Sequence, residues 1–425
     1  MIRSVFLFFI IFYNTIFAID ARMEIIKNKS ALPKIVTAVS SDSINIANEY
    51  QKKIVQIIRK DLEVSGHFEN IELDITNHFD DIPQYQALRN QNIDLYLVVQ
   101  VQNNLQNGLK VNMKLYDVNS NNIVLHRAYT TSSAVRYPFL SHKIAIEVNN
   151  YLKAPAIDWM DKFVIFSRYL DSKTSEIVVS DYTLTYQKVV VKGGLNIFPK
   201  WASKEQKEFY YTTYNYLKPT LMKQNLFTSE SKKILSSDGM IVCSDVSSDG
   251  SKLVLTMAPN SQPDIYVYDT ISNLKTRVTT YDGIDVGGSF VENDSKIVFV
   301  SDRLRYPNIF AKRINSKGVE RLVYHGKNNS QCSTYGDYIV YSSRETDNEF
   351  GDNTFNLYLI STYSDYARRL TTTGKNQFPK FSANGESILF IKNETNKSSL
   401  GITRINYNKN FYFPLKSGKL QSIDW

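Results

Sequence analysis

The sequence predicts a multi-domain protein with a small N-terminal α/β domain, followed by an all-β six-bladed propeller that the C-terminal strand closes. Three observations predict this fold: strand-like segments recur at a nearly constant spacing, one amphipathic helix pattern precedes them, and the last apolar segment falls inside a repeat unit. The 425 residues exceed the usual domain size of about 100 to 200. We expect a signal peptide over residues 1–21, the α/β domain over 22–155 and the propeller over 156–425.

The first residues have the pattern of an export signal. Arg3 precedes an apolar run over residues 5–12, and Ala18 and Ala21 are small residues that would suit cleavage. A membrane-spanning helix needs about 20 apolar residues, whereas polar residues at 13–15 interrupt this run. The pattern therefore predicts an exported mature protein rather than a membrane-anchored one.

Composition argues against a nucleic-acid-binding protein and against a small disulfide-stabilised one. The formal net charge is +8, but the basic residues do not gather on one segment, so a solvated surface is favoured over a nucleic-acid interface. Cys243 and Cys332 are the two cysteines, which does not suit a disulfide framework. We expect both to be buried residues of an ordinary core.

The α/β domain is predicted from periodicity. Residues 48–66 predict a helix with one apolar face, which Gly66 would end. Residues 93–101 predict a central strand, residues 108–131 two strands around an Asn/Ser turn, and residues 137–152 a last helix. The apolar face of the first helix comprises Tyr50, Ile54, Ile57, Ile58 and Leu62.

The propeller is predicted from an internal repeat. Strand-like segments such as "KLVLTM" and "KIVFVS" occur six times, and their equivalent positions are separated by 44, 44, 44, 42 and 49 residues. A period of about 40 to 45 residues with four strands per unit is typical of a propeller blade. The equivalent positions are Ile165, Phe209, Leu253, Ile297, Ile339 and Ile388.

The last strand is out of phase with the first unit. Inner strands are anchored at Trp201, Val246, Phe290, Cys332 and Phe381, and one more period of 44 residues leads to Trp425. The first unit, by contrast, begins at its second strand. We therefore expect the strand that carries Ile423 and Trp425 to complete the first blade and close the ring; a frayed apolar tail is the alternative.

Motifs of common enzymes are absent from the sequence. It contains no "GxSxG" elbow, no "GxxxxGK[ST]" loop, no "HExxH" helix and no paired "CxxC", and the five histidines are scattered. We expect no enzymatic activity and no cofactor. Asp245 and Asp424 each precede an inner-strand anchor, so a Ca²⁺ ion held between them in the channel is one hypothesis, and solvated carboxylates are the other.

Several segments together resemble the TolB family, the periplasmic component of the Tol-Pal system of Gram-negative bacteria. "DLEVSGHFE" (61–69) looks like the family's segment after its first helix, "IDLYLVVQV" (93–101) like its central strand and "DGSKLVLTM" (249–257) like its blade signature. The turns "SSDGSK" and "SANGES" add to the resemblance, which covers the whole mature chain.

The resemblance implies a monomeric, non-enzymatic periplasmic scaffold that supports outer-membrane integrity and constriction during cell division. It implies binding of the lipoprotein Pal at the channel mouth of the propeller and of TolA through the mature N-terminus, and it leaves other outer-membrane or peptidoglycan-associated partners open. The residues expected to bind Pal, in loops of the mouth, are Asn196, Ile197, Phe198, Met240, Ile241, Cys243, Asp285, Val286, Asn376 and Gln377. Those expected to bind TolA are Arg22, Met23, Glu24, Ile25, Ile26 and Lys27.

Two other classes of function remain open at this point. Propellers also occur in lyases and as caps on prolyl-oligopeptidase-type hydrolases, but no hydrolase domain follows residue 425 in this sequence. A periplasmic module that binds a small ligand derived from the cell wall is the other alternative, suggested by the abundant Tyr and Phe.

Overall fold

A computed structural model provides the structure of the protein. The expected signal peptide and the expected TolA-binding residues, Arg22 to Lys27, lie outside the residues that it describes. Within the described residues, no helix is long and apolar enough to cross a membrane. The described residues are 32–42, 47–73, 75, 77–104, 107–349, 352–364, 366–395 and 397–425.

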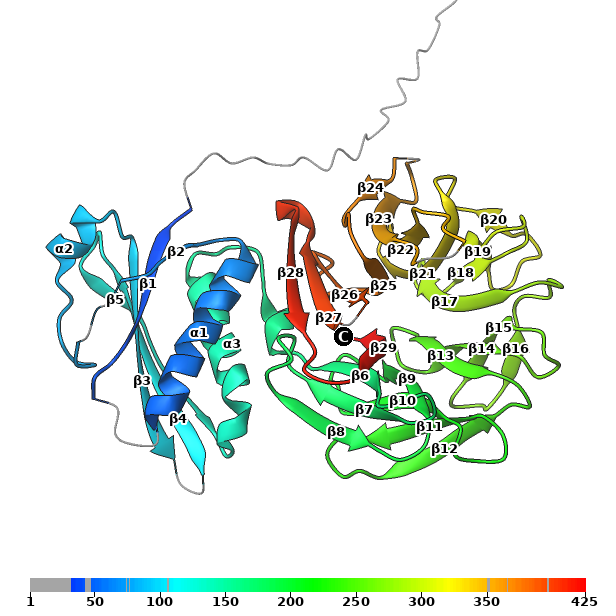
Figure 1. Ribbon diagram of the computed structural model, residues 1–425, viewed down its shortest axis with the longest axis horizontal. Helices are drawn as coiled ribbons and strands as arrows, with labels where there is room; N and C mark the ends of the chain where they lie inside the picture. The colour runs from blue at the N-terminus through cyan, green and yellow to red at the C-terminus, as the bar shows by residue number, and fades with distance from the viewer. Residues whose placement is uncertain are drawn as a thin grey trace, which may run out of the picture. The chain divides into compact units, whose positions relative to one another are not determined.

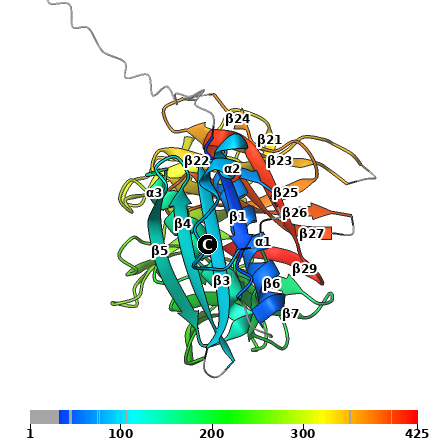
Figure 2. The same ribbon diagram turned by 90° about the vertical axis from the view of Figure 1, so that its left-hand side faces the viewer.

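The N-terminal region contains a five-stranded sheet in the order β2-β1-β3-β4-β5. Strand β1 pairs in parallel with β2 and β3, and the other pairs are antiparallel. Figure 2 shows β1, β3, β4 and β5 side by side. The strands are β1 (Lys34–Val39), β2 (Glu69–Ile71), β3 (Leu95–Asn104), β4 (Gly108–Asp117) and β5 (Asn122–Thr131).

Two long helices, α1 (Ala47–Ser65) and α3 (Tyr137–Tyr151), contact each other, and both contact the sheet. The face of α1 that carries Ile54, Ile58 and Leu62 is buried in the same core as the central strand β3, because these positions recur with the helical period. Gly66 follows α1 with φ +78°, a conformation that favours glycine, and so ends the helix. The region also contains the short strand β2 and the short helix α2 (Tyr85–Asn90).

The region after α3 consists of repeated antiparallel sheets, which Figure 1 shows arranged around a common centre. Three four-stranded sheets consist of consecutive strands: β9 to β12, β13 to β16 and β17 to β20. Their strands are β9 (Asn196–Trp201), β10 (Glu208–Thr213), β11 (Thr220–Asn225), β12 (Ser231–Ser236), β13 (Ile241–Val246), β14 (Lys252–Met257), β15 (Asp264–Asp269), β16 (Lys275–Arg277), β17 (Asp285–Val291), β18 (Lys296–Ser301), β19 (Asn308–Arg313) and β20 (Glu320–Arg321).

The next two repeats form one eight-stranded sheet, because Phe355 of β23 pairs with Lys375 of β25. Within this sheet, β24 pairs with β23, and β25 begins the second run of antiparallel strands. The strands are β21 (Lys327–Tyr335), β22 (Tyr338–Arg344), β23 (Phe355–Ser361), β24 (Arg368–Arg369), β25 (Lys375–Phe381), β26 (Ser387–Glu394), β27 (Lys397–Arg404) and β28 (Lys409–Pro414).

The remaining sheet joins the beginning and the end of the repeat region. Strand β29 (Lys419–Asp424) pairs antiparallel with β6 (Val164–Tyr169), followed by β7 (Ser175–Ser180) and β8 (Gln187–Val191). Ile423 is buried there, as expected. Trp425 was expected to be buried but is partly exposed, because it lies beyond β29 and packs edge-on against Trp159, with 5.2 Å between ring centroids.

The inner strands of successive sheets contact one another. These contacts link β29 to β9, β9 to β13, β13 to β17, β17 to β21, β21 to β25 and β25 to β29. Each of these inner strands contains a β-bulge or register shift. A bulge turns side chains away from the ordinary alternation of a strand, so it can aim extra side chains at the common centre.

A fully buried polar cluster, here called the His142 cluster, joins α1 and α3 to the loop after β7. His142 Nδ1 lies 2.8 Å from Asp61 Oδ2, and His142 Nε2 lies 3.4 Å from Asp181 Oδ2. The hydroxyl of Tyr182 donates to Asp61 Oδ1. All four side chains are inaccessible to solvent.

The protonation of this cluster follows from its charges. Burial lowers the pKa of His142, but the adjacent carboxylates of Asp61 and Asp181 outweigh burial and raise it to about 10. Burial raises the pKa of Asp61 and that of Tyr182. His142 is therefore a buried imidazolium between two acidic side chains, and the scattered positions of the histidines in the sequence did not indicate this.

Candidate functional site: the channel cavity

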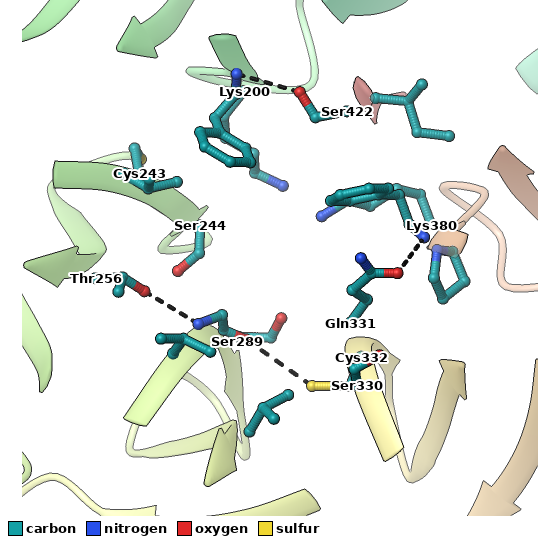
Figure 3. A pocket seen from close by; sticks show the side chains of 18 of the residues that line it. Lys200, Cys243, Ser244, Thr256, Ser289, Ser330, Gln331, Cys332, Lys380 and Ser422 are labelled. Carbon is teal, nitrogen blue, oxygen red and sulfur yellow. Dashed lines mark hydrogen bonds between the residues drawn. The ribbon is translucent and has the colours of Figure 1, made fainter. Parts of the chain in front are cut away.

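The inner strands surround a cavity of about 460 Å³, here called the channel cavity, which Figure 3 shows from close by. This volume is within the range of about 300 to 1,000 Å³ that is usual for ligand pockets. Most of the lining is apolar and includes Phe198, Met240, Val286, Phe378 and Ile423. Lys200 and Lys380 also line the cavity.

Strained backbone at the bulges directs part of this lining. Phe198 has φ +54° and Phe378 has φ +52°, a left-handed conformation that bulky residues rarely adopt. Gly287 has φ +65°, so glycine stands where a third inner strand makes a similar bend. Strain of this kind persists where the surrounding structure enforces it, and it is common at binding sites.

An ion cluster, here called the channel cluster, comprises Lys200, Asp245, Lys380 and Asp424. Lys200 Nζ donates to Asp424 Oδ1 at 3.1 Å and lies 3.2 Å from Asp245 Oδ1. Burial lowers the pKa of Lys200, but the two carboxylates outweigh burial and raise it above its usual value. Lys200 is therefore held as a cation between Asp245 and Asp424.

The same two carboxylates also connect neighbouring inner strands through backbone hydrogen bonds. Asp424 Oδ2 accepts from Trp201 N at 2.8 Å, and Asp245 Oδ2 accepts from Phe290 N at 2.9 Å. Each carboxylate thus uses one oxygen for a neighbouring strand and the other for Lys200.

Lys380 is the cation for which the cluster provides no close partner. Its Nζ lies 4.0 Å from Asp424 Oδ1, and it has no hydrogen bond within the described part of the chain. Burial and the neighbouring charge of Lys200 lower the pKa of Lys380. In Figure 3 the labelled residues Lys200, Ser422 and Lys380 follow one another around the cavity.

Asp245 and Asp424, the two carboxylates of the Ca²⁺ hypothesis, both lie close to the Nζ of Lys200. Within the described ranges, no group of three or more His, Cys, Asp or Glu side chains is placed to hold a metal ion. The carboxylates therefore already have a cation partner in the chain.

Both cysteines line the cavity and are buried free thiols. Burial raises the pKa of Cys332 to about 12 and also raises that of Cys243. Because the thiolate is the reactive form, both side chains behave as small apolar residues of the wall.

The structure separates the residues that were expected to bind Pal into three groups. Phe198, Met240, Cys243 and Val286 line the channel cavity. Gln377 is half-buried in β25 and is not among the lining residues. The remaining five are buried: Asn196, Ile197, Ile241, Asp285 and Asn376.

The buried residues have structural contacts instead. Asn196 donates to Gly193 O, Asn376 donates to Phe355 O and Thr373 O, and Asp285 pairs with Arg303. The expectation that Ile241 is exposed is wrong, because the side chain points into the core beside β14. Apart from Met240, which precedes β13, the residues expected in loops of the mouth lie in strands, since the inner strands begin earlier than the sequence indicated.

Sequence reasoning missed Lys200 and Lys380. The tripeptide Phe-Pro-Lys occurs at 198–200 and again at 378–380, in two different inner strands. In both copies all three residues line the cavity. The repeated tripeptide was the signal that could have found these lysines.

Comparisons with known proteins agree with this architecture. The family model described as "TolB beta propeller domain" matches residues 162–425, and the model "TolB amino-terminal domain" matches residues 21–124. The chain belongs to the TolB family. The α/β region followed by a β-propeller is therefore the TolB architecture.

Relatives extend the match over nearly the whole length. A Tol-Pal system protein TolB from Wolinella succinogenes is 48% identical, with 97% of each chain covered. One from Campylobacter jejuni is 46% identical, with 98% of each chain covered. The crystal structure of TolB from Acinetobacter baumannii shares the fold, with a TM-score of 0.76 and 20% identity over 92% of this chain and 96% of that one.

Proposed function

We propose that this TolB-family chain is a periplasmic, non-enzymatic scaffold of the Tol-Pal system that binds Pal at the channel mouth and TolA through its mature N-terminus. In this role it supports outer-membrane integrity and constriction during cell division. The family membership supports the system, and the export pattern of residues 1–21 supports the compartment.

The proposal includes a propeller of six blades closed by β29. The pairing of β29 with β6 and the succession of contacts among the inner strands support it. Closure of this kind removes free sheet edges, which otherwise attract other strands. A closed ring would hold the cavity wall rigid, so a partner could bind it without reordering the sheets.

The observation that supports Pal binding most is the mainly apolar cavity at the centre of the inner strands. Phe198, Met240 and Phe378 are half-buried on its wall, so each could lose further contact with water when a partner enters. A buried apolar centre with a polar surround is the usual anatomy of an energetically important contact region.

Several features support a role without catalysis. In the channel cluster Lys200 pairs with both acidic side chains, and burial disfavours the reactive form of both cysteines. In place of the Ca²⁺ hypothesis, we propose that the ammonium group of Lys200 is the cation between Asp245 and Asp424. Added Ca²⁺ should then leave the melting temperature of the chain unchanged; a clear rise would restore the Ca²⁺ hypothesis.

Calorimetric titration of the mature chain with the periplasmic domain of Pal from the same cell tests the Pal site. We expect Met240→Asp to abolish tight binding, because it places a carboxylate on the apolar wall. Ile271→Asp is the matched control, since Ile271 is exposed in the loop after β15 and does not line the cavity. Equal binding by both variants would place the Pal site elsewhere.

TolA binding is tested by removing residues 22–27 from the mature chain. We expect the shortened chain to lose TolA binding and to keep Pal binding. Circular dichroism would show that the remaining fold is intact. Retained TolA binding would exclude this segment as the TolA site.

The size of the cavity favours one second candidate, a module that binds a small ligand derived from the cell wall. Titration with muropeptides in the absence of Pal separates the two. Binding of muropeptides by a chain that does not bind Pal would favour this alternative.

A further inference from the structure

Lys200 and Lys380 come from copies of the same tripeptide, yet their surroundings differ. Lys200, on β9, has two carboxylate oxygens within 3.2 Å of its Nζ. Lys380, on β25, has its nearest carboxylate oxygen at 4.0 Å. The difference follows from the order of the inner strands, because β9 lies between the strands that carry Asp424 and Asp245, whereas β25 has β29 and β21 as neighbours.

The acceptor groups near Lys380 already form hydrogen bonds with other donors. Asp424 gives one oxygen to Lys200 and the other to the backbone N–H of Trp201. The side-chain oxygen of Gln331, on β21, accepts from Phe378 N at 3.1 Å. An ammonium group that could form three hydrogen bonds is thus left facing the cavity.

A positive charge in this position favours the binding of an anion in the cavity. The side chain of Lys380 is 21% exposed, and the wall around it is mainly apolar. Charges attract each other more strongly where water is largely excluded. Burial and the charge of Lys200 lower the pKa of Lys380, and the charge of a bound anion would oppose both effects by favouring the protonated form.

The surroundings select the kind of anion. Phosphate groups are usually held by several donors or by the fork of an arginine, and among the described residues that line the cavity there is no arginine. A carboxylate carries a single charge that one ammonium can balance. A carboxylate on an apolar stem, as in Asp or Glu, also matches the apolar wall.

We infer that Lys380 receives a carboxylate side chain of the protein partner that binds at the channel mouth, and that this contact helps to select the partner. The inference rests on the proposed function, since it assigns a chemical feature to the same partner. Lys200, whose charge is balanced within the chain by Asp245 and Asp424, has no such role.

The test measures Pal binding by the full mature chain with Lys380→Met, which keeps the length of the side chain and removes its charge. We expect the dissociation constant to rise about tenfold or more, because the partner's carboxylate loses its cation in a desolvated position. Lys188→Met, on the exposed face of the outer strand β8, is the matched control and should change binding less than about twofold.

The partner's carboxylate is found by replacing each Asp and Glu of the Pal domain with Asn and Gln. For the residue that contacts Lys380, the substitution should weaken binding to the wild-type chain but leave binding to Lys380→Met unchanged. A purely structural role of Lys380 would produce no such non-additivity. The folded state of each variant is checked by thermal unfolding.

The outcomes separate this inference from the proposed function. If the wild-type chain binds Pal, Met240→Asp does not, and Lys380→Met binds as well as wild type, the carboxylate contact is wrong and the scaffold function stands. If the wild-type chain fails to bind Pal at all, both are overturned. A tenfold loss that occurs equally in Lys188→Met would also overturn the inference.

Discussion

The His142 cluster and the channel cluster are both built from buried charged side chains, but they differ in where their partners lie. In the His142 cluster the imidazolium has an acidic group on each side, and the three elements that supply them exclude water. In the channel cluster two cations share two carboxylates unequally, and one ammonium faces a cavity. The comparison teaches that a buried charge with partners in the chain stabilises the fold. A charge without a close partner beside a cavity is instead available to bind a group from another molecule.

The largest change in the free energy of unfolding is expected when the His142 cluster loses its cation. His142→Leu leaves Asp61 and Asp181 buried without their cation, and we expect the free energy of unfolding to fall by about 3–5 kcal/mol. His126→Leu, at an exposed position of β5, should change it by less than about 0.5 kcal/mol. Urea denaturation of both variants measures the difference. A loss below 1 kcal/mol for His142→Leu would mean that the cluster is not a structural bridge.

A smaller loss of stability is expected when the channel cluster loses the charge of Lys200. Lys200→Met leaves Asp245 and Asp424 without their shared cation, but water in the cavity can solvate part of the charge. We expect the free energy of unfolding, measured by urea denaturation, to fall by about 2 kcal/mol, which is less than for His142→Leu. If Lys200→Met proved the more harmful of the two, the channel would be drier than its cavity indicates.

The pH dependence of stability sharpens the comparison further. Folding raises the pKa of His142 from 6.5 to about 10, so the stability gained from its protonation is complete below pH 6.5 and is lost as pH rises through about 10. The titratable groups that face His142 are Asp61 of α1, Asp161 of η2 (Asp158–Asp161), and Asp181 with Tyr182 of the loop after β7.

We therefore expect the free energy of unfolding of the wild-type chain to decline between pH 6.5 and 10. Folded His142→Leu should show a shallower decline, since it lacks the titrating group. Urea denaturation at several pH values measures both slopes. Parallel slopes would show that His142 does not titrate in this range.

The smallest expected change in stability concerns Lys380. Because Lys380→Met removes a partly desolvated ammonium without a close partner, we expect the free energy of unfolding to stay the same or to rise by up to about 1 kcal/mol. Thermal unfolding compares this variant with Lys200→Met. A loss as large as that of Lys200→Met would show that Lys380 is a structural partner of Asp424, as Lys200 is.

Local sequence patterns determined much of the fold. The six equivalent positions from Ile165 to Ile388 all lie in strands and are buried, because alternation within a strand and a constant repeat length can be read along the chain. The apolar face of α1 and the end of this helix at Gly66 could be predicted for the same reason, since both are local patterns of the sequence. The family resemblance, carried by short segments, is confirmed by the matches to relatives.

Only the tertiary structure decided the chemistry of the channel. Asp424 meets Lys200 across more than two hundred residues of sequence, and whether Lys200 or Lys380 receives its oxygen depends on the order of the inner strands around the centre. The inner strands also begin earlier than the sequence indicated, so residues counted as loops, such as Ile241, are buried strand residues. Repeat length and apolar alternation are local properties of the chain, whereas the partner of a charge is set by which strands the fold brings together.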